Sequence, residues 1–264
     1  MEKIYIIKIG GNILDDEQQL HSFLQNLVSI EEKKILVHGG GKLASFTSMK
    51  LGIEPKMHNG RRITDADTLQ VVTMVYAGWI NKSIVAELNG LGVNAIGLCG
   101  ADAQILPAEK RPVRDVDYGF AGDILQEKVN SEFISGLIEK GLLPVIAPIT
   151  ADGNGQLLNT NADTIASVIA VALAEKYKVH LVYCFEKKGV LMDVSDDNSV
   201  LHNLDAASYN QLKSQGVIDK GMLPKLDNAF EALQKGVYKV LIGHADDILS
   251  LTAETKYGGT LIQN

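Results

Sequence analysis

The sequence predicts an α/β protein whose mostly parallel β-sheet carries helices on both faces. Short runs rich in Val, Ile and Leu recur along the chain without alternating with polar residues, which is typical of strands buried on both faces. Stretches with the apolar spacing of amphipathic helices lie between these runs, and this alternation favours parallel strand pairing. The chain has 264 residues, 46% of them hydrophobic and 22% charged, which is enough for a sizeable core in one large domain or two lobes.

In the first half of the chain, strand-like and helix-like segments alternate. Apolar runs predict strands at residues 4–9, 34–37 and 93–98. The segment 17–30 is expected to be a helix, because its apolar residues share one helical face. A helix is also expected at 65–76, where Thr64-Asp65 can cap the first turn, and another at 83–91, which Gly92 can end.

The same alternation continues in the second half. Strands are expected at residues 143–148, 179–185 and 238–242. Helices are expected at 131–140 and 225–234, which end at Gly141 and Gly236, and at 162–177, which is rich in Ala, Ile and Val and should be buried.

Three segments interrupt the alternation and are expected to form hairpins. Asn59-Gly60 is a turn signal within residues 57–63, and Asp152-Gly153-Asn154-Gly155 is another within 150–158. The polar segment 111–122 can hold a third. Such hairpins can cover the C-terminal edge of a parallel sheet, where α/β folds bind ligands. A charged patch at 175–178 suggests a boundary between an N-terminal lobe, 1–177, and a C-terminal lobe, 178–264.

Composition excludes several classes of function. The net charge is −7 and the pI about 5.4, which argues against nucleic-acid binding because that requires a basic face. Cys99 and Cys184 lie in apolar stretches and are expected to be buried thiols in a reducing compartment. The sequence shows neither a signal peptide nor a membrane-spanning run, so we expect a cytoplasmic protein. The histidines are scattered, and no metal site is predicted.

Two strands end in glycine turns that suit an anion. Lys8-Ile9-Gly10-Gly11 closes the first apolar run, and His38-Gly39-Gly40-Gly41 closes the second. Glycines allow backbone N–H groups to approach an anion without obstruction. The alternative is a pair of tight strand-to-helix turns with no ligand. Lys8 favours the anion site, because a lysine buried at a strand end is costly unless a negative charge meets it.

The next pattern is the pair Arg61-Arg62 after the Asn59-Gly60 turn. Adjacent residues on a strand point to opposite faces, so one arginine can be solvated while the other faces the site. An inward arginine can hold a carboxylate with two parallel hydrogen bonds. The alternative is a solvated charge pair.

Two helix starts carry polar residues that suit a ligand. Asn159, Asn161 and Asp163 surround the start of the helix at 162–177, although Asn161 can equally be its cap and Asp163 can complement its dipole. In Gly221-Met222-Leu223-Pro224-Lys225, Pro224 fits a first helical turn. A cation at Lys225 is unfavourable there unless a phosphate binds the same helix start; the alternative is a solvent-facing lysine.

Familiar nucleotide motifs are absent. The sequence lacks G-x-x-x-x-G-K-[ST], G-x-G-x-x-G and the protein-kinase loops, so P-loop enzymes, dinucleotide dehydrogenases and protein kinases are poorly supported. The acidic run 193–198 lacks the spacing of a calcium loop and is expected to be a solvated turn.

Five motifs, in this order, resemble those of the N-acetyl-L-glutamate kinases, which belong to the amino acid kinase (carbamate kinase-like) family. They are Lys8-x-Gly10-Gly11, His38-Gly39-Gly40-Gly41, Asn59-Gly60-x-Arg62-x-Thr64, Asn159-x-Asn161-Ala162-Asp163 and Gly221-Met222-x-x-Lys225. Each motif alone is weakly specific, but the ordered set is strong. The resemblance extends from the first strand to Gly258-Gly259-Thr260.

The resemblance implies a three-layer αβα sandwich with two lobes, the first binding an acyl-amino acid and the second a nucleotide. It implies ATP-dependent phosphorylation of the side-chain carboxylate of N-acetyl-L-glutamate, giving N-acetyl-L-glutamyl 5-phosphate in arginine biosynthesis. Mg²⁺ would be held by the nucleotide phosphates. The implied catalytic residues are Lys8 and Lys225, which neutralise the transferred phosphoryl group, and Asp163, which fixes both lysines. The implied acceptor-binding residues are Gly40, Gly41, Arg62 and Asn159. The implied nucleotide- and phosphate-binding residues are Gly10, Gly11, Asn161, Glu186 and Gly189.

The sequence also departs from the family pattern. Phe185-Glu186-Lys187-Lys188 stands where the family carries Thr/Ser-Asp-Val before Gly-Val-Leu, so Glu186 takes the place of the aspartate. The segment 97–102, near the expected acceptor side, also differs, which leaves a succinyl in place of an acetyl group open. Few residues precede the first strand, so the long N-terminal helix of arginine-inhibited hexamers is missing. We therefore expect a homodimer without arginine feedback.

Two alternatives to this function follow from the same residues. The first is a sister kinase on the same fold that acts on carbamate, aspartate, free glutamate or UMP. The second is a metabolite sensor that has lost catalysis, which the joint presence of Lys8, Asp163 and Lys225 disfavours. Turnover with acylglutamate but not with glutamate distinguishes the readings.

Overall fold

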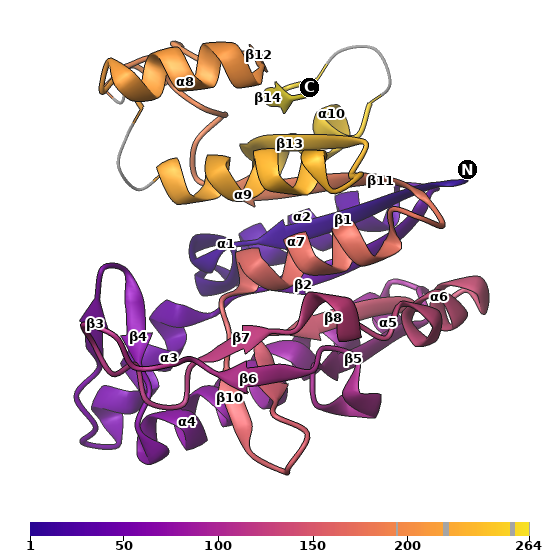
Figure 1. The fold of residues 1–264 in the computed structure, drawn as a ribbon. Helices are drawn as coiled ribbons and strands as arrows, with labels where there is room; N and C mark the ends of the chain where they lie inside the picture. Colours follow the sequence, from indigo (N-terminus) through magenta and orange to yellow (C-terminus); the bar gives the residue numbers. More distant parts are fainter. Residues whose placement is uncertain (194, 219–221, 254–256, 264) are drawn as a thin grey trace.

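A central sheet lies between two layers of helices in the computed structural model, which describes residues 1–193, 195–218, 222–253 and 257–263 (Figure 1). The sheet has eight strands in the order β12-β14-β13-β11-β1-β2-β8-β5. All neighbours are parallel except β13 and β14, which are antiparallel. The predicted α/β class, the three layers and the mostly parallel sheet are confirmed.

The six predicted strands all form, and their ends lie within two residues of the predicted ones. They are β1 (Lys3–Ile9), β2 (Lys33–His38), β5 (Ala95–Cys99), β8 (Leu143–Ala147), β11 (Lys178–Phe185) and β13 (Lys239–His244). Two short strands of this sheet were not predicted, β12 (Asn203–Leu204) and β14 (Thr260–Ile262). Runs of two or three residues carry too little periodicity to be recognised.

Strand β1 lies in the middle of the sheet, and its side chains alternate between the two cores. Ile4 and Ile6 pack with α6 (Ser131–Glu139), α7 (Ala162–Leu173) and α9 (Leu223–Gln234). Tyr5, Ile7 and Ile9 pack on the other face with α2 (Glu17–Val28), α4 (Ala66–Thr73) and α5 (Asn81–Gly90). This alternation explains why the run is apolar throughout, because both faces of the strand are buried.

The helices expected at 65–76 and 83–91 are parts of one continuous helical segment. A π-helix spans Met74–Ile80 and joins α4 directly to α5. Val75, Tyr76 and Ile80 are buried in this stretch, so continuing the helix removes apolar surface from water that a loop would expose. Four further helices were not predicted: α1 (Gly11–Asp15), α3 (Gly41–Lys50), α8 (Ala206–Ser214) and α10 (Ile248–Leu251).

Three hairpins gather at one end of the molecule (Figure 1). Strands β3 (Lys56–His58) and β4 (Arg61–Ile63) enclose Asn59-Gly60, and both turn residues have positive φ, 48° and 73°. Strands β9 (Ile149–Ala151) and β10 (Leu157–Asn159) form the second predicted hairpin. The third pairs β6 (Ala108–Lys110) with β7 (Gly122–Ile124), so residues 111–121 are its connection.

The predicted lobe boundary falls at the start of β11. Because β11 pairs with β1 from Lys178↔Lys3 onward, the sheet continues across this boundary, and the division into two lobes stays a prediction. Among the described residues, no helix combines the length and the apolar character that a membrane crossing requires.

One buried histidine should give the fold a pH-dependent stability. His180 in β11 is 5% exposed and lies between Tyr5 and Tyr238, at ring-centroid distances of 5.2 and 5.3 Å. Neither ring nitrogen has a hydrogen-bond partner among the described residues. Burial above all, and then the nearby lysine charges, lower the pKa of His180 to about 4.

We expect the free energy of unfolding to fall as the pH decreases from about 6.5 towards 4. Below its pKa of about 6.5 the histidine of the unfolded chain binds a proton, whereas folded His180 stays neutral until the pH approaches 4. Protonation therefore favours the unfolded state in this range, and the free energy of unfolding reaches its full value only above about pH 6.5. At pH 5.5 the loss should be about 1 kcal/mol. His180→Phe should remove this share of the pH dependence in urea unfolding at pH 7.5 and 5.5, whereas exposed His58→Gln should not. Equal pH dependence in both variants would contradict the expectation.

Candidate active site

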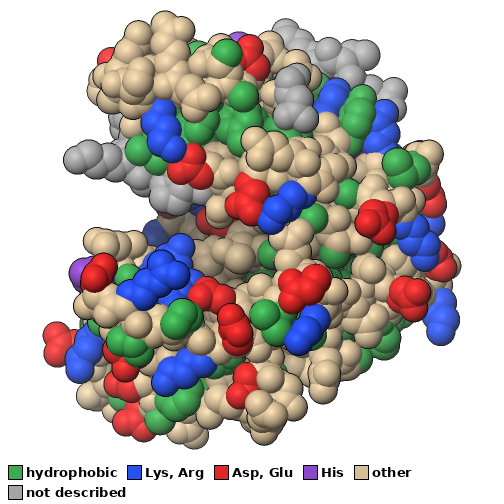
Figure 2. Space-filling model, viewed as in Figure 1, with side chains coloured by type: hydrophobic (Ala, Val, Ile, Leu, Met, Phe, Trp, Pro, Cys, Tyr) green, Lys and Arg blue, Asp and Glu red, His purple; other side chains and the backbone are tan. Residues whose placement is uncertain are grey.

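A cavity of about 250 Å³ opens where β1 and β2 end, between the main sheet and the hairpins. Its walls come from the glycine turns after β1 and β2, from the hairpin β3–β4, from the β6–β7 connection and from the start of α7. Figure 2 shows a hollow beside the hairpins with Lys and Arg side chains on its rim. The cavity lies at the C-terminal ends of parallel strands, where α/β folds bind ligands.

The glycine turns bring free backbone donors to this cavity. Among the described residues, the N–H groups of Gly11, Gly40 and Gly41 have no protein hydrogen-bond partner, and Gly10 lines the same cavity. Gly40 has φ of 142°, and a Cβ there would lie 2.3 Å from Ile80 Cδ1, so only glycine fits. A cavity lined by unpartnered backbone N–H groups can bind an anion such as phosphate or carboxylate.

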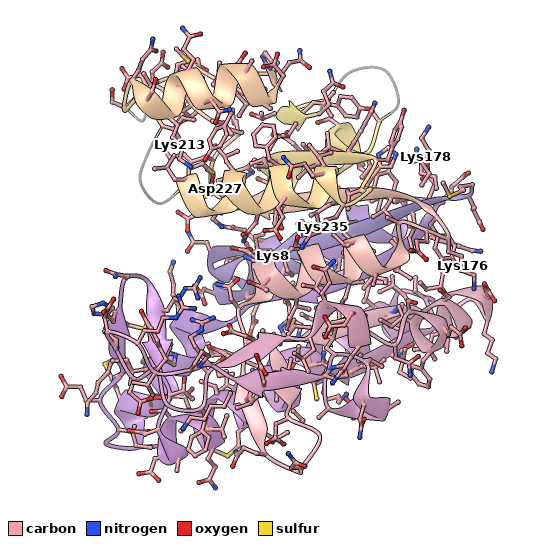
Figure 3. The ribbon with its side chains drawn as sticks, viewed as in Figure 1. Lys8, Lys176, Lys178, Lys213, Asp227 and Lys235 are labelled. Atoms are coloured by element: carbon pink, nitrogen blue, oxygen red, sulfur yellow. The ribbon has the colours of Figure 1, made fainter. Side chains whose placement is uncertain are left out.

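Lys8, Asp163 and Lys225 form a three-membered ion cluster in which the aspartate lies between the two lysines. Lys8 Nζ is 2.7 Å from Asp163 Oδ1, and Lys225 Nζ is 3.1 Å from Asp163 Oδ2. Lys8 is the penultimate residue of β1 and is 9% exposed, while Asp163 and Lys225 lie in the first turns of α7 and α9. Figure 3 shows Lys8 at the level of α7 and α9, far from the peripheral Lys176. The predicted ion pairs are therefore present.

The two lysines keep the Asp163 carboxylate ionised. Burial acts to raise the pKa of Asp163, but the charges of Lys8 and Lys225 outweigh it and lower that pKa to about 2. Asp163 is thus ionised at neutral pH. Two ammonium groups and one carboxylate leave a net charge of +1, which the unpartnered N–H groups of the glycine turns reinforce.

Arg62 is the inward member of the arginine pair, as predicted. It is 9% exposed, whereas its neighbour Arg61 is exposed. Arg62 Nη2 donates to Gly41 O at 2.9 Å and to Ser45 Oγ at 2.8 Å. Arg62 Nη1 is buried and has no hydrogen-bond partner among the described residues, and the Arg62 side chain lines the first cavity.

The two asparagines have different surroundings. Asn161 caps α7, since its Oδ1 accepts from the N–H groups of Asp163 at 2.8 Å and Thr164 at 3.2 Å. The capping alternative is therefore confirmed for this residue, which also lines the cavity. Asn159 donates from Nδ2 to Thr64 Oγ1 at 3.0 Å, which fixes the orientation of its carboxamide at the cavity wall.

A second cavity of about 250 Å³ adjoins the first and shares Gly10 and Gly11 with it. Phe185, Glu186 and His244 line its other side. The glycine turn after β1 is therefore a wall common to both cavities. An extended anionic ligand in the second cavity can reach the first across this turn.

Two predicted site residues are not placed at either cavity wall by these contacts. Gly189 packs against the chain, and a Cβ there would lie 2.6 Å from Thr260 Oγ1. Lys225 is linked to the first cavity by its ion pair with Asp163, and its Nζ also lies 5.3 Å from the Phe185 ring centroid. Gly221, which belongs to the same motif as Lys225, lies outside the described residues.

Sequence reasoning missed several residues of the first cavity, among them Tyr76, Arg111 and Tyr118. Arg111 donates from Nε to Asp123 Oδ1 at 3.0 Å and stacks 5.5 Å from the Tyr118 ring centroid. The charged segment 111–117 gave a weak signal, but nothing in it indicates which arginine turns inward.

The chain is similar to known proteins over nearly its whole length. The model of the amino acid kinase family matches residues 3–244. The chain is 54% identical to the acetylglutamate kinase of Cytophaga hutchinsonii, with 98% of both chains covered, and 52% identical to that of Parabacteroides distasonis, with 94% and 96% covered. It is 38% identical to the acetylglutamate kinase of Methanopyrus kandleri, with 92% and 96% covered.

Solved structures share the fold. The crystal structure of smu.665 from Streptococcus mutans superimposes with a TM-score of 0.78 at 27% identity, covering 98% of both chains. The Giardia lamblia carbamate kinase bound to AMP-PNP gives a TM-score of 0.71 at 15% identity, covering 100% of this chain and 99% of that one. At such identity the second likeness concerns the fold alone.

Proposed function

The chain belongs to the amino acid kinase family, and from this premise we propose that it transfers the γ-phosphoryl group of ATP to the side-chain carboxylate of N-acetyl-L-glutamate. The product is N-acetyl-L-glutamyl 5-phosphate, an intermediate of arginine biosynthesis. The observation that carries the proposal is the Lys8–Asp163–Lys225 cluster beside the unpartnered N–H groups of the glycine turns.

In this proposal the two cavities hold the two substrates. The acceptor lies in the first, where Arg62 Nη1 and the N–H groups of Gly40 and Gly41 can bind its carboxylates and Asn159 its acylamino group. ATP lies in the second, with Glu186 on its wall, and its phosphates extend across Gly10 and Gly11. Asn161 is proposed to support phosphate binding by capping the start of α7. Gly189 is proposed to support the nucleotide loop by its close packing against Thr260.

The reaction needs charge stabilisation and positioning more than proton transfer. A glutamate side chain has an ordinary pKa of about 4.3, so the acceptor is ionised at neutral pH and needs no general base. One carboxylate oxygen bonds to the γ-phosphorus while the bond to the β,γ-bridging oxygen breaks, and ADP leaves with the electron pair. Lys8 and Lys225 offset the negative charge of the migrating group, and Asp163 holds both amines in place beforehand.

The proposal extends to the metal and the assembly. Among the described residues, no group of three or more His, Cys, Asp or Glu side chains is arranged to hold a metal. The only carboxylate in the ion cluster, Asp163, is occupied by two lysines. We therefore propose that Mg²⁺ would be coordinated by the ATP phosphates and would offset part of their charge. We also propose a cytoplasmic homodimer that binds small molecules, not nucleic acid or membrane.

A coupled assay of ADP release tests the function. The purified full chain should turn over with ATP, Mg²⁺ and N-acetyl-L-glutamate, and free L-glutamate should not replace the acceptor. N-succinyl-L-glutamate, carbamate, aspartate and UMP complete the panel, since each represents a related acid on this fold. Phosphorylation of any acid other than an N-acylglutamate, or binding of acylglutamate without turnover, would refute the proposal.

A further inference from the structure

A line of buried polar groups connects the surface to the glycine turn after β2. Asn81 is 1% exposed, and its Nδ2 donates to Val145 O at 3.0 Å and lies 3.2 Å from His38 Nε2. Lys82 Nζ donates to Asn81 Oδ1 at 3.0 Å and to Gly97 O at 2.9 Å. These partners fix the carboxamide of Asn81, with its oxygen towards the ammonium group and its nitrogen towards the imidazole.

The same contacts assign the tautomer of His38. Because Asn81 Nδ2 is a donor, His38 Nε2 must accept, and the ring proton resides on Nδ1. His38 Nδ1 lies 2.9 Å from Gly39 O and donates to it. The ring is fully buried, and burial lowers the pKa of His38 to about 4. It is therefore neutral at physiological pH.

The bond to Gly39 O sets the direction of the next N–H group. In a planar trans peptide, the C=O and the N–H point in opposite directions. The Gly39–Gly40 peptide presents its oxygen to His38, so the Gly40 N–H points away from His38. Gly40 lines the first cavity, and its N–H has no protein partner among the described residues.

Without the hydrogen bond from His38 to Gly39 O, the Gly39–Gly40 peptide would be free to rotate, because glycines on both sides of it permit many backbone conformations. The π-helix that ends at Ile80 completes the arrangement. Ile80 abuts Gly40, and the next residue, Asn81, supplies the bond to His38. π-Helical segments are frequent at functional sites, and here the segment gives one wall and one tether to the same turn.

We propose that His38, Asn81 and Lys82 are positioning residues that hold the Gly40 N–H towards the acceptor and the transferred group. The inference rests on the proposed phosphoryl transfer, because that reaction supplies the negative charge to which the Gly40 N–H would donate. None of the three side chains needs to touch a substrate. They act through the Gly39–Gly40 peptide.

Paired substitutions at His38 test the inference. In His38→Asn the amide nitrogen can take the place of Nδ1 and still donate to Gly39 O, so kcat/KM should remain near the wild-type value. In His38→Leu the volume is similar but the donor is lost, and kcat/KM should fall by about 10²-fold, as expected for a catalytic group displaced by about 1 Å. Lys82→Met should reduce kcat/KM by a smaller factor, while exposed Lys140→Met should not.

Spectroscopy on the wild-type enzyme keeps the test independent of folding of the variants. ¹⁵N NMR of histidine-labelled protein should show His38 protonated at Nδ1 and bare at Nε2. In glycine-labelled protein, the Gly40 amide signal should shift when N-acetyl-L-glutamate is added. The Nε2–H tautomer, or a His38→Leu enzyme with a lower Tm but wild-type kcat and KM, would overturn the inference. Absence of wild-type turnover with every acceptor would instead refute the proposed function, and the tautomer would still be measurable.

Discussion

Lys8→Met should lower kcat by about 10²- to 10³-fold, as does removal of a single transition-state donor in other enzymes. Methionine retains much of the volume of lysine but cannot offset charge on the transferred phosphoryl group. Asp163 would then keep only Lys225, at 3.1 Å, and the pKa of Asp163 should rise. Steady-state kinetics with saturating ATP and N-acetyl-L-glutamate measure the effect, which should appear in kcat more than in either KM.

The matched control for this change is Lys176→Met. Lys176 pairs with Glu139 at 3.0 Å, and both side chains are about half exposed, at 54% and 51%. Exposed pairs contribute between about 0 and 1 kcal/mol, so this variant should keep both its kinetics and its stability. If Lys8→Met retained wild-type kcat while folded, the ion cluster would be structural and not catalytic.

Arg62→Ala should raise the KM for N-acetyl-L-glutamate by about 10- to 100-fold and leave the KM for ATP nearly unchanged. Hydrogen bonds to charged groups contribute about 1.5–3 kcal/mol, and Arg62 Nη1 is buried without a protein partner among the described residues. The guanidinium faces the first cavity and does not line the second.

Another arginine supplies the control. Arg61 also lines the first cavity, whereas Arg114 is exposed and lines neither cavity, so Arg114→Ala should change the acceptor KM far less. Arg62 also donates to Gly41 O and Ser45 Oγ, so the thermal midpoint of each variant should be measured alongside its kinetics. An equal rise in the KM values for ATP and for N-acetyl-L-glutamate would contradict the assignment of Arg62 to the acceptor.

The parts of the fold that depend on local pattern were predictable from sequence. A strand buried on both faces is apolar throughout, so the six long strands were recognised with only small errors at their ends. Period-two alternation correctly predicted that one of Arg61 and Arg62 would be buried. The cost of burying Lys8 predicted an anionic partner, and Asp163 provides it.

The parts that depend on distant contacts were not predictable. The π-helix joins two expected helices because Val75, Tyr76 and Ile80 find apolar partners elsewhere in the chain, which no local signal reveals. Asn81 looks like an ordinary helical residue until the fold brings His38 and Val145 to its carboxamide. The packing of Gly189 against Thr260 likewise joins residues far apart in sequence.

In the proposed reaction, Lys8 and Lys225 meet at one transferred phosphoryl group between the two cavities. A crystal structure with ADP, Mg²⁺, aluminium fluoride and N-acetyl-L-glutamate tests it most directly, because the fluoride complex imitates the migrating group. Both Nζ atoms should lie within hydrogen-bonding distance of the fluorides, about 3 Å, with Asp163 still between them. A closed complex in which either amine stays well beyond that distance would contradict it.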